Sequence, residues 1–300
     1  AKIPSYVSTF GESLSTQTPP MITRKATRSG LPDLRDYFRE TWRFRTFALR
    51  WSAADVKARN FETAFGRAWH VINPLLFGLI YFIFVGILSG GGLDSISMLA
   101  AIIGNLYLWL FFSSIINSSI GAIQSGAGGI LIQSAIPRIV IPIASTITST
   151  NLFMRSLIAY VPIHLVSERG LHIEMLYIPL IVVLTGLFGF GLSLLLATLN
   201  VYARDVSRLV PHVLRLWLYL SPVIWLYTRV LGESSLDQFA RLNPLYPAMT
   251  AWTIALGGHI DPSGPRILEQ IGIFSLWTFA VLVPSVLIFI SKEDEFAIRN

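Results

Sequence analysis

The stretch LNVYARDVSRLVPHVLRLWLYLSPVIW, residues 199–225, joins one long apolar run of the chain to another. Its charged or titratable residues are Arg204, Asp205, Arg208, His212 and Arg215. A cation at the centre of a bilayer costs at least about 2.5–3.5 kcal/mol on insertion scales. The element formed by Arg204, Asp205 and Arg208 therefore favours a membrane surface, and the apolar runs on either side favour the membrane interior.

The composition of the 300-residue chain agrees with a membrane location. Hydrophobic residues make up 53% of the chain and charged residues only 13%, and the mean hydropathy is +0.60. Soluble domains carry about 25% charged residues. The chain contains no cysteine, which excludes disulfides and thiolate metal sites. The sequence therefore predicts an all-α integral membrane protein.

Six apolar runs are long enough to cross the hydrocarbon core, which needs about 20 residues. They lie near residues 70–89, 96–124, 139–166, 175–199, 211–230 and 270–291. Six transmembrane helices place both termini on the same side, with the connections alternating between the two surfaces. The expected transmembrane domain covers residues 69–300.

Residues 1–68 hold 12 of the 23 Lys and Arg residues and 6 of the 17 Asp and Glu residues, so the net charge of +6 belongs to this segment. By the positive-inside rule the N-terminus is cytoplasmic. Residues 1–30 are rich in Ser, Thr and Pro and lack the pattern of a signal peptide, which predicts a disordered cytoplasmic tail.

Residues 31–51 predict an amphipathic interfacial helix within a cytoplasmic lead-in, residues 31–68. At 100° per residue, Arg35, Arg39, Arg43 and Arg50 fall within a sector of about 80°, and aromatic and aliphatic side chains occupy the remaining arc. We expect the apolar face to lie in the acyl boundary and the guanidinium groups to face anionic head groups or a partner.

The segment LNPLYPAMTAWTIALGG, residues 242–258, is apolar but short and interrupted by Pro and Gly. These features predict a re-entrant helical hairpin that enters from the outer face between the fifth and sixth spans. An amphipathic helix lying on the outer surface is the alternative.

The sequence favours a transport or binding role over an enzyme. The five histidines are scattered without adjacent carboxylates, so no metal site is expected. The carboxylates after residue 68 all fall in loops or at span ends, which leaves no acid/base pair within a span. The glycine-rich residues 125–129 lack the Lys and Ser/Thr of a phosphate-binding loop, so the chain is not expected to hydrolyse nucleotide.

Two features of the spans suggest a substrate path. Arg155 lies near the middle of the third span, where it contacts either a phosphate or sugar substrate, or backbone carbonyls and Asn151 within a packed interface. Aromatic residues that can stack on sugar rings recur in the second and fifth spans, although interfacial aromatic belts give the same pattern. The candidates are Tyr107, Trp109, Phe112, Trp217, Tyr219 and Trp225.

Four stretches of this sequence resemble the membrane permease of ABC-2-type polysaccharide exporters, which move lipid-linked O-antigen, teichoic acid or mycobacterial galactan. They are DVKARNFETAFGRAWHVINPLL (55–76), LIQSAIPRIVIPI (131–143), residues 199–225 and LNPLYPAMTAW (242–252). In the first, the resemblance rests on Asp55, Lys57, Arg59, Gly66, Trp69, Asn73 and Pro74.

The resemblance implies a multi-pass protein of the bacterial cytoplasmic membrane that works as a homodimer with two copies of a separate ATPase. ATP and Mg would then bind the partner, this chain would hold no cofactor, and no nucleic acid would be involved. Residues expected to couple to the ATPase are Gln133, Arg138, Arg204, Asp205 and Arg208. Residues expected near a polyprenyl pyrophosphate head group are Arg39, Arg43, Lys57 and Arg59. The expected outer gate comprises Asn243, Pro244, Tyr246 and Pro247.

The expected function is export of a polyprenyl-linked polysaccharide through a channel between two copies, with a cell-wall galactan as the first guess for the polymer. An ABC-2 drug or lipid exporter is an alternative within the same class. A membrane-embedded glycosyltransferase is a competitor from another class, but it needs a carboxylate cluster at the inner face, where Asp205 stands alone.

Overall fold

The computed structural model describes residues 32–58, 68–88, 96–124, 136–167, 169–223, 242–257 and 266–296, and these ranges contain helices and no strands. The predicted tail, residues 1–30, lies outside them, as do the site candidates Arg59, Gln133 and Trp225. The longer helices are α1 (Leu34–Arg43), α2 (Arg45–Ala58), α3 (Trp69–Leu88), α4 (Ile96–Gln124), α6 (Val140–Val166), α7 (Ile178–Tyr202), α8 (Val206–Leu220), α11 (Leu245–Ala255) and α12 (Ile267–Lys292). Two short 3-10 helices, η2 (Ile173–Tyr177) and η3 (Glu293–Glu295), precede α7 and follow α12.

Three described helical segments are long and apolar enough to cross a membrane: Leu99–Gly121, Ile173–Tyr202 and Ile267–Lys292. They match the second, fourth and sixth predicted spans. Helices α3 and α6, of 20 and 27 residues, cover the first and third predicted spans. Helix α8 covers the first half of the fifth, and residues 224–230 lie outside the described ranges. Length and composition thus identify three of the six predicted spans.

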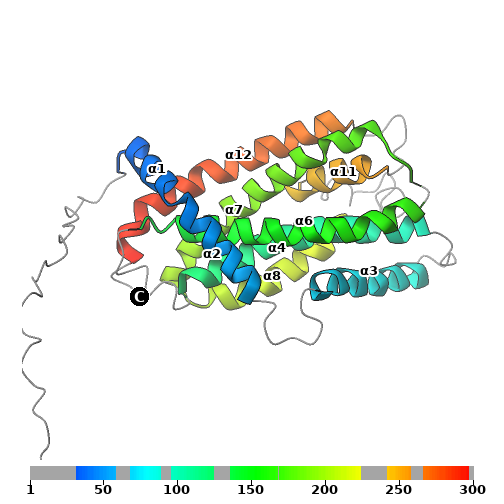
Figure 1. The fold of residues 1–300 in the computed structure, drawn as a ribbon, viewed down its shortest axis with the longest axis horizontal. Coiled ribbons are helices and arrows are strands. Elements are labelled where there is room, and N and C mark those ends of the chain that lie inside the picture. Colours follow the sequence, from blue (N-terminus) through cyan, green and yellow to red (C-terminus); the bar gives the residue numbers. More distant parts are fainter. Residues whose placement is uncertain are drawn as a thin grey trace, which may run out of the picture.

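Helices α4, α6, α7 and α12 lie lengthwise along the molecule (Figure 1), with α4 packed against α6 and α7, and α7 against α12. Helix α1 and the end of α12 lie together at one end, which we call the α1 end (Figure 1). The first described helix and the end of α12 therefore lie at the same end of the molecule. This arrangement agrees with an even number of membrane crossings between them.

The opposite end, which we call the Arg169 end, joins three segments. The guanidinium of Arg169 donates hydrogen bonds from Nε to the backbone oxygen and to Oγ of Ser97, both at 3.1 Å, and from Nη1 to the backbone oxygen of Leu256 at 3.4 Å. Burial lowers the pKa of Arg169, and the nearby Tyr160 partly opposes this shift. Ser97 lies at the start of the second predicted span, and Arg169 follows the third. Both positions are predicted to face outward, and both lie at this end.

Close packing holds the long helices together, since lipid tails are as apolar as the side chains and give helices little hydrophobic reason to associate. A Cβ built on Gly191 of α7 would lie 2.9 Å from the backbone Cα of Leu282 on α12. A side chain at this position would separate the two helices. Gly191 therefore allows their close approach.

The predicted interfacial helix is two helices that meet at Phe44. Helix α1 ends there, and the side chain of Arg45 covers its last turn by donating to the backbone oxygen of Trp42 at 3.2 Å. Helix α2 packs on α6 and buries Ala48 and Ser52. The large apolar side chains of Leu34, Phe38, Trp42 and Leu49 are exposed. These exposed side chains belong to the face predicted to enter the acyl boundary, whereas Tyr37 of the same face is buried.

Helix α11 is too short to cross a membrane. Its 11 residues extend about 16 Å, against a hydrocarbon core of about 30 Å. It packs against α4, α7 and α12, and nine of its 11 residues are buried, with Trp252 donating from Nε1 to the backbone oxygen of Gly104 at 2.9 Å. Gly257, with a φ of 71°, follows its last turn. This burial contradicts the alternative of an amphipathic surface helix, which would leave one face exposed.

Candidate functional site

A buried carboxylate joins three distant segments at the α1 end. Glu293 is 5% exposed and follows directly after α12. The hydroxyl of Tyr37 on α1 donates to its Oε2 at 2.5 Å, and the backbone N–H of Arg138 donates to its Oε1 at 2.6 Å. The Arg138 guanidinium donates to the backbone oxygen of Glu293 at 2.8 Å. We call Tyr37, Arg138 and Glu293 the Glu293 junction.

Local structure holds each member of the Glu293 junction in place. The side chain of Asp33 caps α1 by accepting from the backbone N–H of Arg35 at 2.9 Å. The guanidinium of Arg138 lies over the ring of Phe296, 5.9 Å from its centroid, and Phe296 is fully buried. A buried carboxylate is stable only when it is paired or hydrogen-bonded. The backbone N–H of Arg138 and the hydroxyl of Tyr37 meet that requirement.

The end of α7 is attached to the same C-terminal turn. The hydroxyl of Tyr202 donates to Oε2 of Glu295 at 2.5 Å, and Nζ of Lys292 forms an ion pair with Oε1 of Glu295 at 2.7 Å. Arg138, in the segment before α6, and Tyr202, the last residue of α7, therefore both contact residues that follow α12.

The turn between α7 and α8 is exposed, as the charges of the opening stretch predict. Arg204, Asp205 and Arg208 are all exposed, and the Asp205–Arg208 ion pair measures 4.0 Å with side chains 82% and 86% exposed. The backbone N–H of Ser207 donates to Oδ1 of Asn200 at 2.9 Å, which fixes the start of α8 against the end of α7. The turn thus presents its charges beside a fixed start of α8.

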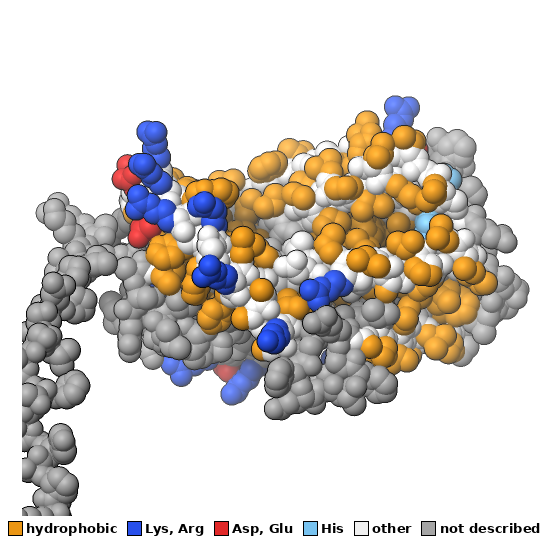
Figure 2. All heavy atoms as spheres, in the orientation of Figure 1, with side chains coloured by type: hydrophobic (Ala, Val, Ile, Leu, Met, Phe, Trp, Pro, Cys, Tyr) orange, Lys and Arg blue, Asp and Glu red, His pale blue; other side chains and the backbone are white. Residues whose placement is uncertain are grey.

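The described head-group candidates Arg39, Arg43 and Lys57 are exposed on α1 and α2. Figure 2 shows Lys and Arg side chains gathered over these two helices, while most of the remaining described surface in this view is hydrophobic. This distribution places the described N-terminal charge at the α1 end.

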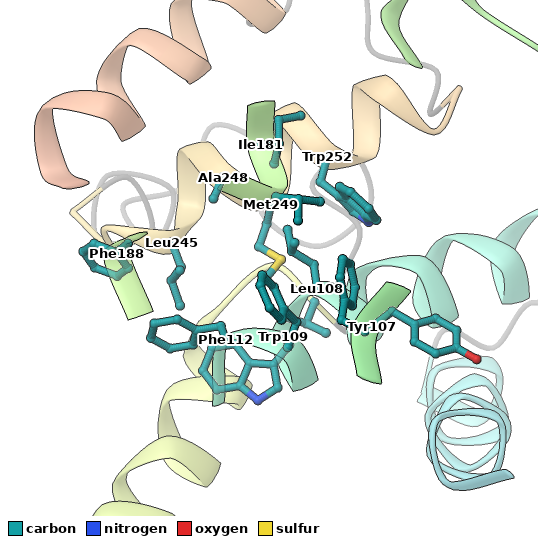
Figure 3. Close-up of a cluster of buried hydrophobic side chains, with 14 of the residues drawn as sticks. Tyr107, Leu108, Trp109, Phe112, Ile181, Phe188, Leu245, Ala248, Met249 and Trp252 are labelled. Carbon is teal, nitrogen blue, oxygen red and sulfur yellow. The ribbon is translucent and has the colours of Figure 1, made fainter. Parts of the chain in front are cut away.

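Three of the channel candidates are part of the protein core. Tyr107, Trp109 and Phe112 are at most 3% exposed. Trp109 and Phe112 lie beneath Leu245 and Met249 of α11 (Figure 3). A sugar polymer outside the subunit cannot reach these rings in this structure. The expectation that they line a channel is therefore corrected, because tertiary packing covers them.

The other described channel candidates are more accessible. Trp217 is half-buried, and its ring contacts that of Phe112 at a centroid distance of 5.4 Å, while Tyr219 is exposed. Arg155 is exposed on α6, and no described residue accepts a hydrogen bond or forms an ion pair with it. Asn151, one of its suggested partners, donates instead to Oγ of Ser52 at 3.4 Å.

The outer-gate candidates lie where α11 begins, and Asn243 connects this point to α8. Its Oδ1 accepts from Nε1 of Trp217 at 2.9 Å and from the backbone N–H of Leu245 at 3.0 Å, and its Nδ2 donates to Oγ of Ser221 at 2.9 Å. Pro244 directly precedes α11. The two remaining candidates, Tyr246 and Pro247, are buried in α11.

A family model described as ABC-2 type transporter matches residues 53–256, which is more than half of the chain. The chain belongs to the ABC-2 type transporter family. All four stretches on which the resemblance rests lie within the matched residues, so the family prediction is confirmed.

Curated relatives of this ABC-2 protein are named as export permeases. It is 24% identical over 261 residues to the O-antigen export system permease protein RfbA of Myxococcus xanthus, covering 86% of this chain and 97% of the relative. It is 25% identical over 244 residues to a protein of the same name from Klebsiella pneumoniae, covering 81% and 90%. Together with the apolar helices, the family identifies a membrane-embedded protein.

Sequence reasoning missed the Glu293 junction of this ABC-2 protein. Tyr37 and Glu293 lie outside the family match, whereas Arg138 lies within it. Nothing in the sequence distinguishes Tyr37 from the other aromatic residues of its helix. Glu293 is likewise one of several acidic residues near the C-terminus. Only the position of Arg138 in a predicted coupling loop gave a signal, and that signal did not identify its partners.

Proposed function

We propose that this ABC-2 permease exports a polysaccharide linked to a polyprenyl diphosphate, with a cell-wall galactan as the first candidate polymer. The observation that carries the proposal is the match to export permeases over almost their whole length, 97% and 90% in the two relatives. Such coverage supports a similar membrane subunit with a similar class of cargo.

In the proposed mechanism the permease contributes the membrane path and a partner subunit contributes the energy. Two copies of this chain form the path, and two ATPase subunits bind ATP and Mg²⁺ at the cytoplasmic face. The exposed turn with Arg204, Asp205 and Arg208 is one proposed ATPase contact, and the bond from Tyr202 to Glu295 would pass its displacement to the turn after α12. The Glu293 junction would join that turn to α1. Nucleotide binding would thereby favour the open state of the path.

The proposed substrate contacts are the candidates that the subunit core leaves accessible. Arg155 needs water, a partner subunit or an anion because an exposed cation within a span is costly in lipid. Trp217 and Tyr219 of α8 offer ring faces, and Arg39, Arg43 and Lys57 supply cations at the α1 end. Tyr246 and Pro247 would act through the packing of α11 and not through direct contact with the polymer.

Depletion of the protein in its native cell tests the proposed function. We expect polymer to disappear from the cell surface while lipid-linked polymer accumulates inside, and sugar analysis of the accumulated material tests the galactan assignment. An unchanged surface polymer together with no internal accumulation would contradict polysaccharide export.

A further inference from the structure

Helix α8 carries two exposed stripes of different chemistry beside its buried face. Every third or fourth residue along one line is polar and exposed: Arg208, His212, Arg215 and Tyr219, which we call the cationic stripe. The next line contains Leu209, Val213, Leu216 and Leu220, each at least 55% exposed, which we call the apolar stripe. The third line, with Val210, Leu214 and Leu218, is buried against the rest of the chain.

Helical geometry makes both stripes continuous. At 100° per residue the four members of each stripe fall within a sector of about 60°, and the two sectors are neighbours. With a rise of 1.5 Å per residue, Arg215 lies about 10 Å along the helix from Arg208. The cationic stripe therefore extends from the exposed turn into the part of α8 that is predicted to enter the membrane.

The described residues give Arg215 no neutralising partner. Asp205, which forms the ion pair with Arg208, lies in the turn before α8, and no described carboxylate is paired with Arg215. The far end of the stripe lies near α3, where Tyr81 is close to Tyr219 and Arg215. A guanidinium at this depth requires water or an anion.

Contact with an ATPase does not account for the whole pattern. A soluble partner at the exposed turn would reach Arg204 and Arg208, but Arg215 is two helical turns further along. Such a partner would also leave the adjacent apolar stripe without a role. A ligand that combines an anionic group with a hydrocarbon chain matches both stripes at once.

We propose that the two stripes bind a lipid-linked diphosphate, with its phosphates on His212 and Arg215 and its hydrocarbon chain along the apolar stripe. A planar guanidinium group binds phosphate oxygens in pairs, and Arg215 lies on the same side of the helix as His212. The identification of this ligand as the export substrate rests on the proposed function. The binding of a phosphate head group beside a hydrocarbon chain is argued from the two stripes alone and does not rest on that function.

Binding of radiolabelled farnesyl diphosphate to the full-length protein in phosphatidylcholine nanodiscs tests the stripes directly. We expect Arg215→Gln to weaken binding at least tenfold, and Arg215→Lys, which keeps the charge and loses the paired geometry, to weaken it less. The matched control is Arg266→Gln, since Arg266 is also exposed but lies before α12. It should bind like the unchanged protein. Equal affinities of properly folded Arg215→Gln and Arg266→Gln would overturn the proposal.

Competition separates the two sources of a phosphate head group. Unlabelled farnesyl diphosphate should displace the probe, and phosphatidylglycerol at the same concentration should not. Equal displacement by phosphatidylglycerol would identify an ordinary phospholipid site and overturn the assignment to a lipid-linked diphosphate. Tight, Arg215-dependent binding in a protein whose depletion leaves surface polymer unchanged would support the stripes and contradict the proposed function, so the two failures are distinguishable.

Discussion

Glu293 connects parts of the chain that are far apart in sequence. Its hydrogen-bond partners Tyr37 and Arg138 lie 256 and 155 residues away. Hydrogen bonds to a charged group contribute about 1.5–3 kcal/mol each, and more is lost when a buried partner is left unsatisfied. One carboxylate therefore accepts hydrogen bonds from both α1 and the segment before α6.

Replacement of Glu293 by Gln should separate ATP hydrolysis from export. The carboxylate offers one acceptor oxygen to Tyr37 and the other to the backbone N–H of Arg138, and the amide replaces one of these two acceptors with a donor. We expect a loss of about 1–3 kcal/mol in stability and severalfold lower export, with ATP hydrolysis by the complex retained. Surface polymer and hydrolysis rates, measured on the same strain, check this result.

Glu269→Gln is the matched control for Glu293→Gln. Glu269 is exposed in the first turn of the same helix, at the opposite end from Glu293. Export and hydrolysis should both remain unchanged in this variant. Parallel losses of hydrolysis and export in Glu293→Gln would instead indicate that the carboxylate is needed for assembly.

Asn243→Ala should loosen the connection between α8 and α11. The substitution removes the acceptor for Trp217 and for the backbone of Leu245, together with the donor to Ser221. We expect the free energy of unfolding to fall by roughly 1–3 kcal/mol, measured by thermal unfolding in detergent. Asn151→Ala, which removes one long hydrogen bond on an exposed face, should change the midpoint far less. Similar shifts in both variants would contradict a special role for Asn243.

At the scale of the elements, the contact between α7 and α12 provides a test of helix packing. Gly191→Ala places a methyl group 2.9 Å from the backbone of Leu282, where only backbone movement can relieve the clash. Overpacking of this kind costs about 1–3 kcal/mol. We expect a lower thermal midpoint in detergent.

Gly272→Ala on α12 is the control for Gly191→Ala, because nothing lies within 4 Å of the added methyl group. Alanine favours helix more than glycine, so this variant should be as stable as the unchanged protein or slightly more stable. A destabilisation equal to that of Gly191→Ala would show that helix propensity, and not close approach, controls the effect.

Hydropathy and helix-breaking residues predicted which elements form, and tertiary packing determined the rest. Continuous apolar runs correctly predicted helices at α4, α7 and α12, and the Pro and Gly residues around α11 correctly predicted its short length. The break at Phe44 was not predicted, because the periodicity of residues 31–51 continues through it. Trp109 and Phe112 are covered by α11, which lies more than 100 residues away in sequence. The sequence around these two residues therefore does not show whether their rings are buried or line a substrate path.

At the scale of the whole molecule, the two ends should face opposite sides of the membrane. The chain has no cysteine, so single introduced cysteines can be labelled without background. Ala203→Cys lies on the exposed turn after α7 and Leu171→Cys on an exposed segment at the Arg169 end. A membrane-impermeant maleimide applied to spheroplasts should label Leu171→Cys, and Ala203→Cys should react only after permeabilisation. Equal labelling of both in intact spheroplasts would contradict the predicted orientation.

Sequence alone located the exposed turn of the candidate site but not its connection to the long helices. Arg204, Asp205 and Arg208 predict a position at the membrane surface because burying charged side chains in lipid is costly. That cost depends only on the local sequence. The bonds of Glu293 depend on how α1, α6 and α12 meet, and no local pattern encodes that arrangement.

Purification of the tagged protein from its native membrane in a gentle detergent tests the central claim most directly. An ABC-2 permease of an exporter should bring a soluble ATPase in a fixed ratio, and the complex should hydrolyse ATP while this chain alone does not. A chain that emerges without any ATPase and itself transfers sugar to or from a polyprenyl carrier would contradict the account.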